Sequence, residues 1–306
     1  MNPAFSVIFL TTLIGAAQGL FLALFGAQLA DLATPAFLVT GGAVALALTV
    51  AGLVASFFHL GRPERAWRTA TMWRTSWLSR EVIALPLFMG GLFLWTLDHV
   101  LGLGYTLVLG GFTALASVAL FVCTAMIYAC IKFLQEWASP YTLVNYTLLG
   151  LASGCTLATA LAGLMAPEMI GFFGAAALLF TAFGLVSRWL SLLRNARLVP
   201  RSTLQSAIGI RHPKITQRAQ GFMGGSFNTR EFFHGKTPGV LRSVKWAFLL
   251  GAFVLPLALV ALGIVSASAG LLVLAFAVQY LGLLAERWFF FAQANHPQNL
   301  YYQTVS

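Results

Sequence analysis

Eight continuous apolar runs divide the 306-residue chain, and they constrain its fold more than any other feature of the sequence. A run of about 20 apolar residues is long enough to cross the hydrocarbon core of a bilayer as an α-helix. A transmembrane β-barrel would instead show short segments in which apolar and polar residues alternate. The sequence therefore predicts an all-α polytopic membrane protein with eight transmembrane helices, at about residues 6–30, 36–60, 82–102, 104–131, 141–165, 168–194, 244–268 and 270–293.

Composition excludes a soluble globular protein, since 59% of the residues are hydrophobic and only 8% are charged. Residues 1–5 lack the positive charges that begin a signal peptide, so we expect the first apolar run to be retained as a span. The formal net charge of +10 does not require nucleic acid, because basic residues in a membrane protein report orientation and contact with anionic lipid. We expect a single integral membrane domain over residues 1–306.

All 18 lysines and arginines fall on one face of this predicted domain. Five lie in the loop 61–81, one in the loop 132–140, eleven between residues 188 and 245, and one near the end of the eighth run. The positive-inside rule makes this face cytoplasmic, which predicts a multi-pass protein of the bacterial cytoplasmic (inner) membrane with both termini inside. The long segment 195–243 on this face carries several phenylalanines and predicts an ordered docking surface, with a basic lipid-binding loop as the alternative.

The polar stretch 58–81, between the second and third runs, concentrates groups that carry chemistry. His59 ends the second run and Glu81 begins the third, so we expect both at one depth on adjacent helices. A quinone needs hydrogen-bond donors at its oxygens and a nearby proton donor or acceptor, and histidine and glutamate supply both. The alternative is an ordinary basic, aromatic anchoring loop in which His59 is a capping or interfacial residue. The predicted quinone-binding residues are His59, Arg62, Arg65, Trp67, Trp77, Arg80 and Glu81.

The sequence lacks the signals that are typical of other redox proteins and of transporters. No two of the five histidines are expected at matched depth within spans, as a bis-histidine haem requires. The cysteines form no C-x-x-C pair, and no P-loop or dinucleotide fingerprint follows a predicted strand. We expect charge within the spans to be almost absent. A proton pump or ion-coupled transporter buries acidic residues at the midplane of its spans, and we expect this chain to bury none there. We predict neither a metal site nor a catalytic residue on this chain.

A short repeat relates the two parts of the chain. Ser76–Glu81 and Ser226–Glu231 share the pattern Ser, aromatic, any residue, Ser or Thr, Arg, Glu, and each is expected to enter a span, the third and the seventh. Such a repeat predicts two parallel four-helix halves, at about residues 1–135 and 136–306. The alternative is helix capping, in which Ser79 or Thr229 begins the helix and the glutamate lies in its first turn.

Three segments together resemble a known family of membrane anchors. They are His59-Leu60-Gly61-Arg62-Pro63, Trp77-Leu78-Ser79-Arg80-Glu81, and the later run Ser202-Thr203-Leu204-Gln205-Ser206-Ala207-Ile208-Gly209. The chain is similar, over nearly its whole length, to the membrane-anchor subunit family of dimethyl sulfoxide reductase (DmsC). The resemblance implies a haem-free anchor that binds menaquinone, with the family's functional histidine and glutamate at His59 and Glu81. It also implies two partners, a four-cluster [4Fe-4S] iron–sulfur subunit and a molybdopterin catalytic subunit with a molybdenum bis-pterin cofactor.

This resemblance implies a subunit that passes electrons between the iron–sulfur partner and a membrane quinone, either menaquinone or ubiquinone. The basic face favours cytoplasmic partners, which fits the anchor of a cytoplasmic sulfite-oxidising complex in the same broad family better than an exported reductase. The alternatives are the anchor of a dimethyl sulfoxide or polysulfide-type reductase and a non-redox membrane transporter. The residues expected to dock the partner are Arg68, Arg74, Arg211, Lys214, Arg218, Arg230 and Glu231.

Overall fold

The computed structural model describes residues 1–219 and 231–302, and eight helices among them are long and apolar enough to cross a membrane. The all-α, eight-span prediction is therefore confirmed. The first six spans are α1 (Phe5–Leu29), α2 (Pro35–Phe57), α3 (Trp77–Leu101), α4 (Thr106–Ala129), α5 (Pro140–Met165) and α6 (Ile170–Ala196), which follows the 3-10 turn η2 (Pro167–Met169). The seventh span joins α9 (Pro238–Leu249), a π-helical segment η3 (Leu250–Val254) and α10 (Leu255–Val265), and the eighth is α11 (Ala269–Ala292).

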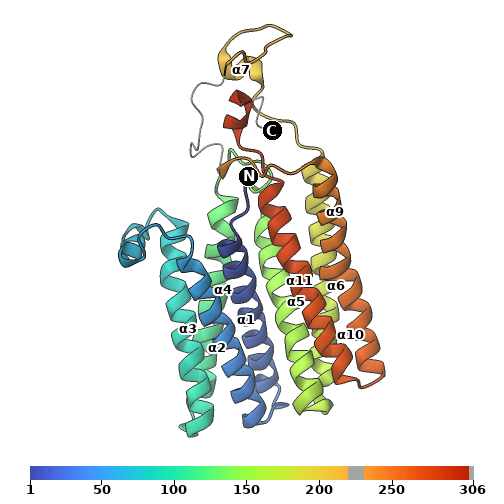
Figure 1. Cartoon of the computed structure of the whole chain (residues 1–306). Coiled ribbons are helices and arrows are strands. Elements are labelled where there is room, and N and C mark those ends of the chain that lie inside the picture. Colours follow the sequence, from blue (N-terminus) through green and yellow to red (C-terminus); the bar gives the residue numbers. More distant parts are fainter. Residues whose placement is uncertain (220–230, 303–306) are drawn as a thin grey trace.

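Short elements gather at one end of this bundle. The 3-10 helix η1 (Pro63–Met72), the single-turn α7 (Leu204–Ile208) and the 3-10 turn η4 (Pro297–Tyr301) all lie at the end that also holds the N-terminus (Figure 1). Each connects or follows segments at the face that carries the basic residues. Which side of the membrane this end faces remains the prediction of the positive-inside rule.

Side-chain caps explain where two helices begin. The Ser76 side chain accepts a hydrogen bond from the Ser79 backbone N–H, so α3 starts at Trp77, earlier than the sequence suggested, with Ser76 as the capping residue and not Ser79. Thr237 caps α9 in the same way, and Pro238 occupies the first helical turn. Glu231 therefore lies outside the seventh span, on the surface, and the expectation that it enters this span was wrong. The matching residues 226–230 lie outside the described part of the chain.

Helices α1 and α5 pack against each other at the centre of the bundle through glycines (Figure 1). A Cβ atom at Gly154 would overlap the backbone of Gly19 and Leu20, and a Cβ atom at Gly19 would overlap the carbonyl of Gly150. Small residues let two membrane helices approach this closely, and van der Waals contact then holds them together. The contact joins α1, from the first predicted half, to α5, from the second.

The structure buries a cluster of charged residues within the spans, where the sequence indicated that charge is almost absent. Arg188 of α6 and Glu286 of α11 form an ion pair of 2.7 Å, and each side chain is 1% exposed. Arg287 lies 3.9 Å from the second Glu286 oxygen, and Asp98 near the far end of α3 is also buried. The sequence placed Arg188 near the end of the sixth span. However, α6 continues to Ala196, so Arg188 lies about two turns inside the helix.

The buried ion pair predicts an asymmetric response to substitution. Glu286→Gln leaves the Arg188 guanidinium buried without its counter-charge, which we expect to cost about 3–5 kcal/mol. The double variant Arg188→Met/Glu286→Met removes both charges and should recover most of that loss. Thermal unfolding of the detergent-solubilised protein measures both effects, with Glu64→Gln, from an exposed pair at 3.8 Å, as the neutral control. A Glu286→Gln protein as stable as this control would contradict the assignment.

The glycine contact predicts a second difference in stability. Gly154→Ala places a methyl group against the backbone of α1, so the helices must separate, at a cost of about 1–3 kcal/mol. Gly90→Ala is the matched control, because a Cβ atom there meets no atom within 4 Å. Thermal unfolding in detergent should show a lower midpoint for Gly154→Ala and an unchanged or higher midpoint for Gly90→Ala. Equal midpoints would show that α1 and α5 do not need this contact.

Candidate functional site

His59 lies just beyond the end of α2, at the surface. Helix α2 ends at Phe57, and the His59 backbone N–H still donates to the Ser56 carbonyl at 3.4 Å. Partial burial lowers the pKa of the His59 imidazole below its usual value. The ring is therefore predominantly neutral at pH 7, and one nitrogen donates a hydrogen bond while the other accepts one. A neutral histidine with these properties suits a carbonyl-containing ligand at the edge of the membrane.

The segment after His59 forms η1, which projects beside the upper end of α3 (Figure 1). Arg62, Arg65 and Trp67 lie there, in or beside η1, so three of the predicted quinone-binding residues lie at the periphery of the bundle. Arg80 fixes the other end of the loop, because its guanidinium donates to the carbonyls of Trp73 (2.9 Å) and Arg74 (2.8 Å). The same guanidinium lies 4.2 Å from the centre of the Trp77 ring, a cation–π contact.

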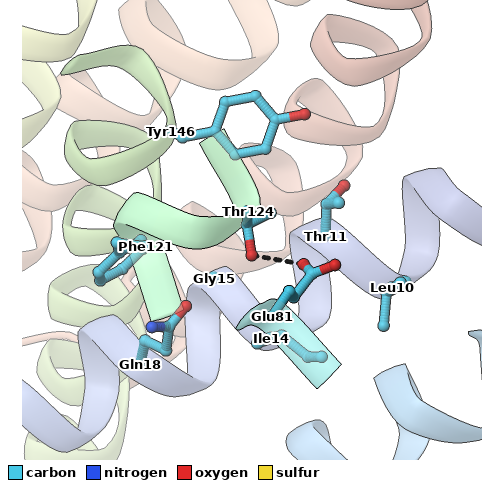
Figure 2. A pocket seen from close by; sticks show the side chains of 9 residues that line it. All are labelled: Leu10, Thr11, Ile14, Gly15, Gln18, Glu81, Phe121, Thr124 and Tyr146. Carbon is cyan, nitrogen blue, oxygen red and sulfur yellow. Dashed lines mark hydrogen bonds between the residues drawn. The ribbon is translucent and has the colours of Figure 1, made fainter. Parts of the chain in front are cut away.

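Glu81 has a different environment, inside the bundle. Its carboxylate accepts a hydrogen bond of 2.5 Å from the Thr124 hydroxyl of α4 (Figure 2). A cavity of about 10 Å³ adjoins it, with room for about one water molecule. Helices α1, α3, α4 and α5 all contribute to its walls. The residues that line it are Leu10, Thr11, Ile14, Gly15, Gln18, Glu81, Phe121, Thr124 and Tyr146.

Tyr146 connects this cavity to the buried ion pair. Its ring lines the cavity on one side, and the Arg287 guanidinium lies 3.7 Å from the ring centre. Arg287 in turn adjoins Glu286, which pairs with Arg188. Polar and charged side chains therefore run from Glu81 on α3, across Tyr146 on α5, to α11 and α6.

The structure thus divides the predicted site into two parts. Trp77, Arg80 and Glu81 share the first turns of α3, but Arg80 points to the loop whereas Glu81 points into the bundle. His59 is not among the residues that line the Glu81 cavity. Of the predicted docking residues, Arg68, Arg74, Arg211, Lys214, Arg218 and Glu231 are exposed, whereas Arg230 lies outside the described residues.

Sequence reasoning missed the partners of Glu81. Thr124 and Tyr146 lie within apolar runs that are far from Glu81 in the chain, and nothing in a run that is apolar all round marks the face it turns to a neighbour. The contact between Tyr146 and Arg287 was missed for the same reason. An acidic residue one turn inside a span was the available signal, because it requires polar partners on adjacent helices.

Two comparisons with known proteins agree with each other. The family model described as "DMSO reductase anchor subunit (DmsC)" matches residues 1–291. A sulfite dehydrogenase subunit of Allochromatium vinosum is 52% identical over 325 aligned positions, which cover 100% of this chain and 100% of that protein. The matched region therefore spans η1, the start of α3, and helices α6 and α11. This chain belongs to the DmsC family of membrane-anchor subunits.

Proposed function

We propose that this chain is the membrane anchor and quinone-binding subunit of a molybdenum/iron–sulfur oxidoreductase that oxidises sulfite on the cytoplasmic side. The end-to-end similarity to a protein that is named as a sulfite dehydrogenase subunit supports the choice of complex. The observation that carries the quinone assignment is a partly buried carboxylate, Glu81, beside a water-sized cavity at the end of the bundle that holds the basic loops. The partners in this proposal are a four-cluster iron–sulfur subunit and a molybdopterin subunit.

The size of the cavity limits where the quinone ring binds. A space of about 10 Å³ holds about one water molecule and excludes a ring. The ring therefore binds on the outer side of Glu81, at the end of the bundle where α2 ends near His59 and α3 begins with Trp77 and Arg80. Neutral His59 supplies a hydrogen bond to a ring oxygen, and the aromatic side chains supply flat apolar walls.

Glu81 then serves as the internal proton carrier. Quinone reduction consumes two electrons, which arrive from the iron–sulfur partner, and two protons, which end on the ring oxygens. Glu81 is partly buried between α3 and its neighbours α1, α4 and α5, and Thr124 orients its carboxyl group. A carboxyl so placed passes a proton to the ring and recovers one through the cavity water. Tyr146 bounds the cavity, and the Arg287 guanidinium lies against the Tyr146 ring.

Substitution of Glu81 tests this role. Glu81→Gln keeps the hydrogen bond to Thr124 but cannot carry a proton, so sulfite-dependent reduction of a short-chain quinone should fall by about 100-fold or more. Sulfite-dependent reduction of ferricyanide, which accepts electrons before the membrane, should be unchanged. Glu64→Gln on η1 is the control and should leave both activities intact. Normal quinone reduction by Glu81→Gln would exclude Glu81 as the proton carrier.

The docking proposal depends on charge. Arg211, Lys214 and Arg218 are exposed on the long segment before α9, and they form a basic surface for an acidic partner. The triple charge reversal Arg211→Glu/Lys214→Glu/Arg218→Glu should release the peripheral subunits from washed membranes at lower salt than the wild type does. Glu168→Lys, an exposed charge reversal at the opposite end of the bundle, is the control. Retention equal to that of the control at every salt concentration would show that these residues do not dock the partner.

A further inference from the structure

Two hollows lie one above the other along α9 and α11. The upper hollow, of about 650 Å³, is lined by residues that include Lys236, Leu241 and Gln293. The lower hollow, of about 340 Å³, is lined by residues that include Phe5, Val244 and Trp288. Leu241 and Val244 lie one turn apart on α9, and Trp288 lies about one turn before the end of α11. Figure 1 shows the upper end of α11 between those of α1 and α9.

The lower hollow has apolar walls. Phe5 and Phe9 of α1 are exposed on one side, and Leu284, Ala285 and Trp288 of α11 lie on the other. Three membrane spans form this hollow near their upper ends, so it is surrounded by lipid. A groove of this size and chemistry accepts a hydrocarbon chain, because its described lining residues carry no charge and, apart from the Trp288 indole N–H, no polar side-chain group that would lose a hydrogen bond.

The upper hollow presents hydrogen-bond donors and positive charge. Lys236 contributes an ammonium group, and the Gln293 amide nitrogen is buried and has no hydrogen-bond partner among the residues that the structure describes. The Lys236 backbone N–H donates to Nδ1 of His234 at 3.0 Å, so the neutral His234 ring carries its proton on Nε2. Burial, and then the positive charges of the N-terminal amine and Lys236, lower the pKa of His234. The described residues that line this hollow include neither aspartate nor glutamate.

We propose that the two hollows together bind one anionic phospholipid. Its phosphate lies in the upper hollow, where Lys236, His234 and Gln293 donate to the oxygens. One acyl chain lies in the lower hollow, against Ala285 and Trp288. The order of the hollows along the spans matches that of a lipid, with the polar group at the membrane surface and the chain toward its centre. The bound lipid then joins α1, of the first predicted half, to α9 and α11 of the second.

Native mass spectrometry of the full-length chain, purified in mild detergent with the subunits that copurify, tests this site. After removal of endogenous lipid, phosphatidylglycerol or phosphatidylcholine is added back and the bound fraction is measured. We expect Lys236→Gln to weaken phosphatidylglycerol binding about fivefold and to leave phosphatidylcholine binding unchanged. Ala285→Phe fills the lower hollow and should weaken phosphatidylglycerol binding as well.

Matched controls separate this site from general lipid contact. Lys214→Gln removes an exposed charge that does not line the upper hollow, and Ala43→Phe adds the same bulk on the exposed face of α2. Both should bind phosphatidylglycerol as the wild type does. Equal binding by all four variants would overturn the proposal. It would also be overturned if the lipid that Ala285→Phe fails to bind were an isoprenoid quinone and not a phospholipid. Lys236→Gln alters only an exposed side chain, so it remains informative if Ala285→Phe fails to fold.

Discussion

The close contact between α1 and α5 is the constraint on which the rest of the structure depends. Glycines on both helices leave no room for even a methyl group, so the two backbones meet at the centre of the bundle. The contact fixes the distance between Gly15 and Gln18 on α1 and Tyr146 on α5, and these residues form opposite walls of the Glu81 cavity. A wider separation would open the cavity and expose the carboxylate to more water. The packing of two apolar helices thereby sets the environment of the principal polar group.

The charged residues inside the bundle also depend on contacts between helices. Arg188, Glu286 and Arg287 are removed from water, and each finds a partner on a neighbouring helix, as a buried ion requires. The Arg287 guanidinium lies against the Tyr146 ring on one side of α5, and Tyr146 also borders the cavity of Glu81. Tyr146 therefore lies between the Arg287 guanidinium and the Glu81 carboxyl group. In the proposed function, this arrangement lets the second half of the chain influence proton transfer in the first.

The site combines an outer surface for a lipid-soluble carrier with a protected carboxyl group. The arginines and tryptophans of η1 belong to the membrane interface, where aromatic and basic side chains are both stable. Arg80 joins this loop to α3 through two carbonyls, so the loop and the first turn of the helix hold one position relative to each other. In the proposed function, the quinone binds on the outer side of this contact between the loop and α3. The proton carrier, Glu81, lies on the inner side, and one turn of α3 separates the two.

The sequence by itself determined the membrane class, the number of spans and the gathering of basic residues at one end. These depend on the length of apolar runs and on the position of charges along the chain. It also singled out Glu81 as a candidate, because a carboxylate at the mouth of a span stands out against the apolar run that follows. Only the tertiary structure decided that Glu81 turns to Thr124, that His59 lies outside the cavity, and that Arg188 meets Glu286. The physical reason is that spans surrounded by lipid and by one another are apolar on every side, so their periodicity does not show which faces meet.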